Sequence, residues 1–174
     1  MLQRSRIGIA IPAFNEANAI GKVIADLPEW IDDVVVSDNG STDRTAQVAE
    51  QAGALVVREN RRGYGAACLA AIAELSDAEI IIFIDGDYSD YPQDAAQLVQ
   101  PILEDQADLV IGSRVLGNAE PGALTPQQAF GNWLATRLIS WIWGVRFTDL
   151  GPFRAIKTSA LKQLNMQDQN FGWT

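Results

Sequence analysis

The stretch IIIFIDGD, residues 80–87, joins five apolar residues to two carboxylates that follow them directly. A short run rich in isoleucine and closed by a glycine turn predicts a strand buried on both faces of a parallel sheet. Ligands of open α/β sheets bind just beyond the carboxyl ends of the strands. The sequence therefore places Asp85 and Asp87 where such a sheet binds its ligand. Gly86 lets the backbone bend there and leaves room for a large group.

Two carboxylates on a tight turn can hold a hard divalent cation. Mg²⁺ and Mn²⁺ prefer oxygen ligands and commonly share them with substrate phosphates. The alternative is a solvated acidic turn. Because so apolar a strand precedes Asp85 and Asp87, the pattern favours a site for a metal–phosphate complex.

Strand and helix patterns alternate along the chain. Strands are predicted at 7–11, 34–36, 55–57, 80–84 and 109–111, and helices at 16–27, 45–52, 64–75 and from Pro92 to about Leu103. This alternation implies a mainly parallel sheet with helices on both faces. Beyond residue 113 we expect a loop at 117–126, an aromatic helix at 127–143, a short strand at 153–156 and a short helix at 158–164.

Composition limits the classes of function. The chain has 174 residues, a net charge of −9, no histidine and one cysteine, Cys68. The acidic balance argues against binding nucleic acid or an anionic membrane through bulk charge. The absence of histidine excludes a Ser-His-Asp triad, a Cys-His pair and a histidine-based zinc site. A single cysteine, which we expect to be buried packing, suits a reducing compartment. We expect neither a signal peptide nor a membrane-spanning segment.

The loops after the strands exclude several nucleotide folds. No G-x-G-x-x-G motif follows the first strand, where PAFNE (12–16) stands instead, and no P-loop motif occurs in the chain. These absences disfavour a dinucleotide dehydrogenase, a P-loop kinase and a P-loop ATPase. The segment RRGYG (61–65) contains glycines without the P-loop lysine. It is either a solvated loop or an anion site at the start of the next helix.

Five segments lie at or near the predicted carboxyl ends of strands. They are IPAFNE (11–16), SDNGSTD (37–43), RRGYGAA (61–67), IDGDYSDYP (84–92) and IGSR (111–114). Together they resemble the glycosyltransferase family 2 enzymes. Two further segments, TDLGPFRAI (148–156) and FGWT (171–174), resemble the polyprenyl-phosphate (dolichol-phosphate) sugar transferases, especially their glucosyltransferase-like bacterial branch.

The resemblance covers essentially the whole chain and implies the GT-A fold. This is a Rossmann-like α/β fold with three α/β/α layers and a mainly parallel sheet. It implies a single domain over residues 1–174, with a nucleotide-sugar-binding half at 1–115 and an acceptor-side half at 116–174. Because relatives usually continue past this point, we expect the acceptor-side half to be incomplete.

The resemblance also implies roles for individual residues. The donor nucleotide would contact Pro12, Phe14, Glu16, Asp38, Gly63, Asp85 and Gly86. The metal would bind Asp87 and Asp85. The catalytic residues, near the diphosphate or the acceptor, would be Asp149, Arg154 and Arg114. In this chain the family's paired acid is Asp38-Asn39, so an amide replaces its second carboxylate.

Structural alternatives remain for several of these residues. Glu16 has the position of a first-turn helix charge, and Asp38 that of a turn carboxylate beside a glycine. Asp149 is either an acceptor-side base or a structural partner of Arg154. Three neighbouring side chains are predicted to cap a helix rather than to contact the donor: Ser41, Thr42 and Asp43.

The resemblance implies inverting, metal-dependent transfer of a sugar from a nucleotide diphosphate, with UDP-glucose favoured and GDP-mannose second. A lipid-phosphate acceptor is already an anionic nucleophile, so it needs cations more than a base. Four arginines suit that role: Arg114, Arg137, Arg146 and Arg154. A saccharide hydroxyl would instead require a base, for which Asp149 is the candidate. A non-catalytic nucleotide-sugar-binding module is the third alternative.

The predicted helix at 127–143 carries apolar residues at spacings of three and four. They are Phe130, Trp133, Leu134, Leu138, Trp141 and Ile142. This pattern is typical of a core-facing helix, and with Arg137 it also suits a membrane-interface surface that receives a lipid. We therefore expect a cytoplasmic protein, with peripheral contact at the cytoplasmic membrane face and a homodimer as open alternatives.

Overall fold

The computed structural model describes residues 5–113, 126–144 and 148–170. Contacts divide the chain into two units. The first takes the chain up to Val110 and again from Phe153, and the second is Ile111–Pro152. The predicted residues Arg114 and Arg146, the loop at 117–125 and the FGWT segment lie outside the described residues.

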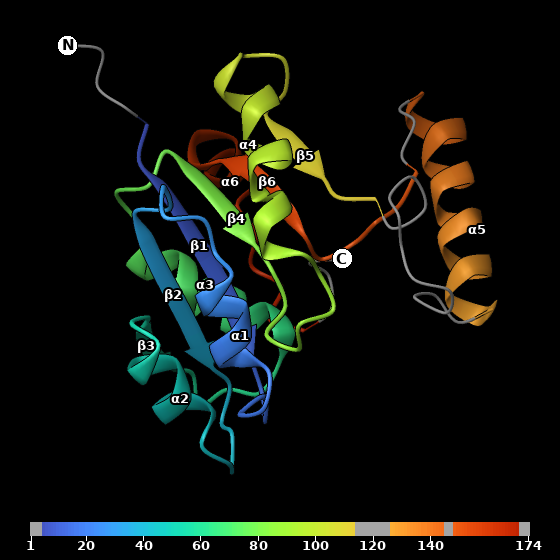
Figure 1. Cartoon of the computed structure of the whole chain (residues 1–174). Helices are drawn as coiled ribbons and strands as arrows, with labels where there is room; N and C mark the ends of the chain where they lie inside the picture. Colours follow the sequence, from blue (N-terminus) through green and yellow to red (C-terminus); the bar gives the residue numbers. More distant parts are fainter. Residues whose placement is uncertain (1–4, 114–125, 145–147, 171–174) are drawn as a thin grey trace. The chain divides into compact units, whose positions relative to one another are not determined.

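The first unit is built on a six-stranded sheet (Figure 1). Its strands are β1 (Ile7–Ala13), β2 (Asp33–Asp38), β3 (Leu55–Arg58), β4 (Ile80–Phe83), β5 (Leu109–Ile111) and β6 (Arg154–Lys157). Its helices are α1 (Ile20–Ala25), α2 (Thr45–Gln51), α3 (Tyr64–Glu74), the 3₁₀ turn η1 (Pro92–Asp94), α4 (Ala95–Leu103) and α6 (Thr158–Leu164). The predicted alternation of strands and helices is confirmed. The helix expected at 16–27 is wrong in its bounds, because α1 begins only at Ile20.

The strand order is β3-β2-β1-β4-β6-β5. β1 to β4 pair in parallel, whereas β6 runs antiparallel to β4. The chain first adds β2 and β3 on one side of β1, and then crosses through α3 to place β4 on the other side. This reversal lies between β1 and β4, and such a switch point opens a crevice beyond the carboxyl ends of the two strands.

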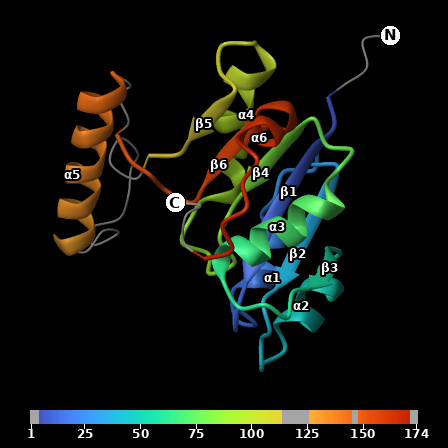
Figure 2. The same ribbon diagram turned by 180° about the vertical axis from the view of Figure 1, so that it is seen from behind.

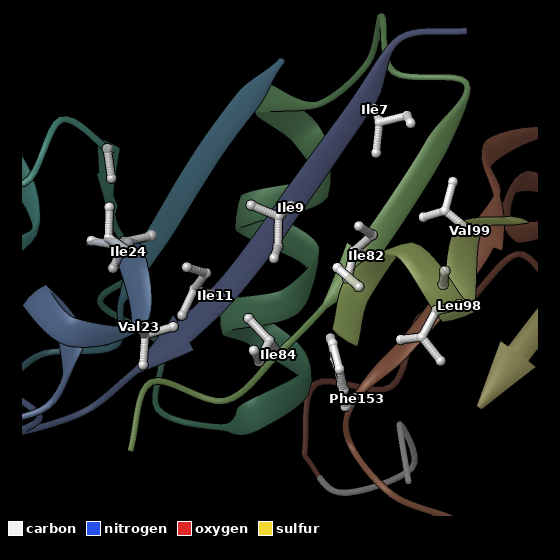
Figure 3. Close-up of a cluster of buried hydrophobic side chains, with 14 of the residues drawn as sticks. Ile7, Ile9, Ile11, Val23, Ile24, Ile82, Ile84, Leu98, Val99 and Phe153 are labelled. Atoms are coloured by element: carbon white, nitrogen blue, oxygen red, sulfur yellow. The ribbon is translucent and has the colours of Figure 1, made fainter. Parts of the chain in front are cut away.

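Both faces of β4 are buried, which explains its uninterrupted apolar sequence. Ile82 and the following Ile84 lie in a cluster with Ile9 and Ile11 of β1 and with side chains from α1 and α4 (Figure 3). Ile81 and Phe83 point to the other face, where α3 and α6 pack. Figures 1 and 2 show α1 and α3 on opposite faces of the sheet. The sheet is therefore the middle of three α/β/α layers.

In the second unit, the expected aromatic helix is present as α5 (Pro126–Trp143). Five of its large apolar side chains are exposed: Trp133, Leu134, Leu138, Trp141 and Ile142. The guanidinium of Arg137 lies 5.5 Å from the centre of the Trp133 ring. The side chain of Phe130 lies outside the described residues. No helix in the described part of the chain is both long and apolar enough to cross a bilayer.

The start of α3 is closed by a segment from near the end of the chain. The backbone N–H groups of Gly65 and Ala66 donate to the carbonyls of Asn170 (2.8 Å) and Gln169 (3.0 Å). Gly63 stands directly before this junction with a φ of +141°, and a Cβ there would lie 2.0 Å from the Gln169 carbonyl oxygen. A side chain at Gly63 is therefore excluded by both backbone conformation and space.

Alanine substitutions at Gly63 and Gly53 separate the effect of the backbone conformation from the effect of the missing space. Gly53 also has a positive φ, +95°, but a Cβ there would meet nothing within 4 Å. We expect Gly53→Ala to lower the free energy of unfolding by about 1–2 kcal/mol, the cost of an unfavourable backbone conformation. Gly63→Ala should cost a further 1–3 kcal/mol, roughly that of overpacking. Urea denaturation measures both, and equal losses would contradict the close packing against Gln169.

Candidate functional site

A cavity of about 340 Å³ opens where β1 and β4 end. Six of the residues expected to bind the donor or the metal line it: Pro12, Phe14, Glu16, Asp85, Gly86 and Asp87. The first three follow or end β1, and the last three follow β4. The switch point of the sheet thus brings two distant motifs to one cavity.

Five other residues line the same cavity: Ala13, Asn39, Arg62, Tyr64 and Ala67. The guanidinium of Arg62 lies 4.4 Å from the centre of the Phe14 ring. The hydroxyl of Tyr64 donates to Oδ1 of Asp85 at 3.0 Å. Sequence reasoning assigned no role to Tyr64 or Asn39, although both stand in the motifs that carry the resemblance. For Arg62, the cavity-facing position favours the functional interpretation over a solvated loop.

Two expected nucleotide-binding residues lie outside the cavity lining. Asp38 is buried at the end of β2, and its Oδ1 accepts a hydrogen bond from the N–H of Ser41 at 3.0 Å. This contact is the turn role that was its structural alternative. Gly63 donates its N–H to Oδ1 of Asn39 at 2.9 Å. The carbonyls of Gln169 and Asn170 occupy two N–H groups at the start of α3, so an anion at this loop would bind through the side chain of Arg62 and not through those N–H groups.

The structure describes two of the three expected catalytic residues, and they belong to different units. Arg154 begins β6 opposite Phe83. Burial raises the pKa of Tyr64, and the positive charge of Arg154 offsets a small part of that rise, so Arg154 lies within electrostatic reach of the Tyr64 hydroxyl. Asp149 belongs to the second unit, where it is buried and its Oδ1 accepts from the N–H of Leu150 at 2.8 Å. Arg114 lies outside the described residues.

The loop after β1 is held by side chains of the SDNGSTD segment and by the threonine that begins α2. The N–H of Glu16 donates to Oγ1 of Thr45 at 2.7 Å, and that of Ala17 donates to Asp43 at 3.2 Å. The N–H of Thr42 donates to Oδ1 of Asn15 at 2.8 Å. Asn15 itself has a φ of +59°. Because this conformation and these bonds are not helical, α1 begins later than its apolar spacing suggests.

Negative charge gathers in the cavity. The pKa of Glu16 is raised above its ordinary value by burial first, and then by the charges of Asp87, Asp43 and Asp85. The pKa of Tyr64 is raised by burial and by Asp85, which keeps its hydroxyl a hydrogen-bond donor. Burial also raises the pKa of Cys68 to about 12, which fits the packing role predicted for this thiol.

The carboxylates fit a metal that binds together with a phosphate. Within the described ranges, no group of three or more acidic, histidine or cysteine side chains is arranged to hold a metal by itself. Mg²⁺ sites typically use one or two carboxylates and complete the coordination with water and substrate phosphates. Asp85 and Asp87 supply that number, and Oδ1 of Asp87 accepts from the N–H of Ser89 at 2.9 Å.

Known proteins similar to this chain include several sugar transferases. The glycosyltransferase AglJ of Haloferax volcanii is 35% identical over 166 residues, which is 94% of this chain and 54% of AglJ. A dolichyl-phosphate hexose transferase of the same organism is 31% identical over 145 residues, covering 82% of this chain and 62% of that protein. The chain therefore spans little more than half of these relatives.

Solved structures of similar proteins show which fold the chain has. The glucosyl-3-phosphoglycerate synthase of Mycobacterium tuberculosis, in complex with Mn²⁺, UDP-glucose and phosphoglyceric acid, superimposes with a TM-score of 0.72 at 27% identity. The match covers 91% of this chain and 58% of the synthase. The α/β fold with a mostly parallel sheet is thus the predicted GT-A fold.

The family is shown directly by its sequence signature. The family model described as Glycosyl transferase family 2 matches residues 8–164, a range that includes every residue lining the cavity. The chain belongs to glycosyl transferase family 2.

Proposed function

We propose that this chain binds a nucleotide-diphosphate sugar with Mg²⁺ or Mn²⁺ in the cavity between β1 and β4, and transfers the hexose with inversion to a polyprenyl or dolichyl phosphate or a related lipid acceptor. The observation that carries the proposal is the meeting of Phe14 and Arg62 with the Asp85–Asp87 turn around one cavity. Such a site offers a flat surface for a base and charged groups for a diphosphate.

The nucleoside would bind at the β1 side of the cavity. The Phe14 ring is 42% exposed and offers an aromatic surface for a nucleobase. Pro12 and Glu16 line the same cavity, and Asp38 and Gly63, which lie outside its lining, stay expected nucleotide-binding residues. The volume of about 340 Å³ lies within the usual range for small-molecule sites. We favour UDP-glucose, which the solved relative binds, and place GDP-mannose second.

The diphosphate would lie at the β4 side. Asp85 and Asp87 would hold the cation, and Gly86 lets the turn between them pack closely against β1, because a Cβ there would lie 3.3 Å from the Cβ of Ala13. When bound, a divalent cation offsets the negative charge that develops on the departing diphosphate. Tyr64 orients Asp85 through its hydroxyl. Arg62 adds a positive charge to the cavity wall, which would stabilise the charge that develops on the diphosphate.

The acceptor decides what the remaining residues must do. In transfer to a lipid phosphate, a phosphate oxygen bonds to the anomeric carbon as the bond to the diphosphate breaks, and no proton has to be removed. Arg154 and Arg114 would hold that phosphate. One named relative is a dolichyl-phosphate hexose transferase, which supports this acceptor class. The second candidate is transfer to a hydroxyl, with Asp149 as base, and the solved synthase that binds phosphoglyceric acid keeps it open.

Ligand-induced thermal shifts test the donor site. We expect either UDP or GDP to raise the melting temperature of the protein, and only when Mn²⁺ or Mg²⁺ is present. The nucleotide sugar with the same base should do likewise. Ligand at a hundredfold its Kd stabilises the native state by about 2.7 kcal/mol. Asp87→Asn should abolish the metal-dependent shift. The matched control Asp94→Asn, on an exposed carboxylate of η1, should retain it. A full shift in Asp87→Asn would overturn the metal assignment.

The raised pKa of Glu16 gives a second test. The folded state binds the Glu16 proton more tightly than the unfolded state, so ionisation of Glu16 costs stability above its folded pKa. Without metal, Glu16→Gln should therefore be more stable than wild type at neutral pH. The gain should vanish below about pH 4, where both states are protonated. Denaturation across pH measures this. The exposed Glu29→Gln is the control, and a gain that is independent of pH would show that ionisation of Glu16 is not its cause.

Asp149 separates the two acceptor classes. Asp149→Asn should leave transfer to a polyprenyl phosphate within about threefold of wild type, because a phosphate needs no base. Transfer to a hydroxyl acceptor should fall by about 10²–10⁴-fold, the usual contribution of a general base. Initial rates with radiolabelled UDP-glucose and each acceptor decide between them. An equal loss of transfer rate with both acceptors would show that Asp149 has a structural role.

A further inference from the structure

We propose that Asn39 is a positioning residue for the donor cavity, and that its amide is required there in place of a carboxylate. The inference rests on the proposed donor site. The side chain forms three hydrogen bonds, all to the backbone of the loop between β3 and α3. Nδ2 donates to the carbonyls of Glu59 (3.2 Å) and Arg61 (2.7 Å), and Oδ1 accepts from the N–H of Gly63 (2.9 Å).

These contacts determine the orientation of the amide. Two carbonyl oxygens face one side-chain atom and an N–H faces the other, so only Nδ2 toward the carbonyls satisfies all three partners. A carboxylate cannot donate. An aspartate at this position would bring a negatively charged oxygen against the Glu59 and Arg61 carbonyls, with Asn39 only 9% exposed. Burial without compensating hydrogen bonds makes that arrangement unfavourable.

The bonds hold the two peptide groups that flank Arg62. The Arg61 carbonyl belongs to the peptide before Arg62, and the Gly63 N–H belongs to the peptide after it. Asn39 is itself fixed, because its N–H donates to the Ala13 carbonyl at 2.9 Å beyond the paired ends of β1 and β2. The backbone of Arg62 is therefore anchored to the sheet, and its guanidinium lies over Phe14.

The hydrogen bond from Gly63 to Asn39 also affects the residue that follows Gly63. The next residue, Tyr64, begins α3 and donates its hydroxyl to Asp85. One amide thus positions both the Arg62–Phe14 wall and the Tyr64–Asp85 contact. Both donor hydrogens of Nδ2 are used within the loop, so the amide has no N–H left for a ligand. Asn39 therefore acts through Arg62 and Tyr64.

Titration of UDP with Mn²⁺ by calorimetry tests the inference. Asn39→Ala and Asn39→Asp should each weaken binding by about tenfold or more, with Asp the weaker binder. The matched control is Asn60→Asp, the same change of amide to acid on an exposed residue of the same loop. It should stay within about twofold of wild type. Wild-type affinity in both Asn39 variants would overturn the inference.

A measurement on the protein without ligand separates the positioning role of Asn39 from the proposed donor site. Amide hydrogen exchange over residues 59–64 should be faster in both Asn39 variants and unchanged in Asn60→Asp. If wild type binds neither UDP nor GDP, the proposed function fails, while exchange still tests the anchor. Unchanged exchange would overturn the anchor whatever the binding result.

A double-mutant cycle tests whether Asn39 acts through Arg62. Combined with Arg62→Ala, Asn39→Ala should weaken UDP binding less than in the wild-type background. Fully multiplicative effects would contradict a positioning role. Because Arg62 is exposed, Arg62→Ala should keep the fold and so provides a usable background.

Discussion

Burial of β4 on both faces is the constraint on which the rest of the structure depends. A strand covered by α1 and α4 on one side and by α3 and α6 on the other must be apolar at every position. Its first polar residues can therefore appear only where it leaves the sheet. Because β1 pairs with it in parallel, both strands release their loops at the same edge. The cavity follows from that shared edge rather than from any single motif.

The loops at this edge are not paired to one another by regular backbone hydrogen bonds. Short polar side chains accept hydrogen bonds from their backbone N–H groups instead. Asn15, Asp43 and Thr45 bond across the loop after β1, and Asn39 bonds across the loop before α3. Each of these bonds joins segments that are far apart in sequence. The loops that line the cavity are thereby joined to one another by side chains of the SDNGSTD segment and by Asn15 and Thr45.

Much of the fold was predictable because double-sided burial leaves a strong local pattern in β1, β2 and β4. The orientation of β6 was not, since a four-residue strand such as RAIK has the same composition whichever way it runs. The late start of α1 could not be predicted either. Ile20, Val23 and Ile24 have helical spacing, but the backbone N–H groups before them donate to side chains of another segment. The apolar run before Asp85 and Asp87 was enough to predict a ligand site there, and the family resemblance added the roles expected of the two carboxylates. The part played by Asn39 depends on carbonyls about twenty residues further on, which no local pattern reveals.

The closure of α3 by Gln169 and Asn170 has a consequence for the charge of the cavity. A helix start normally presents several unpaired N–H groups and a partial positive charge. In this chain two of those groups are satisfied by neutral carbonyls from near the end of the first unit. A chain shortened to end before Gln169 would uncover them beside Tyr64. Gly65 and Ala66, which carry these groups, lie in sequence between Tyr64 and Ala67 of the cavity lining. Unpaired N–H groups at a helix start attract anions, so the contact with Gln169 and Asn170 keeps an anion from binding there, next to the cavity.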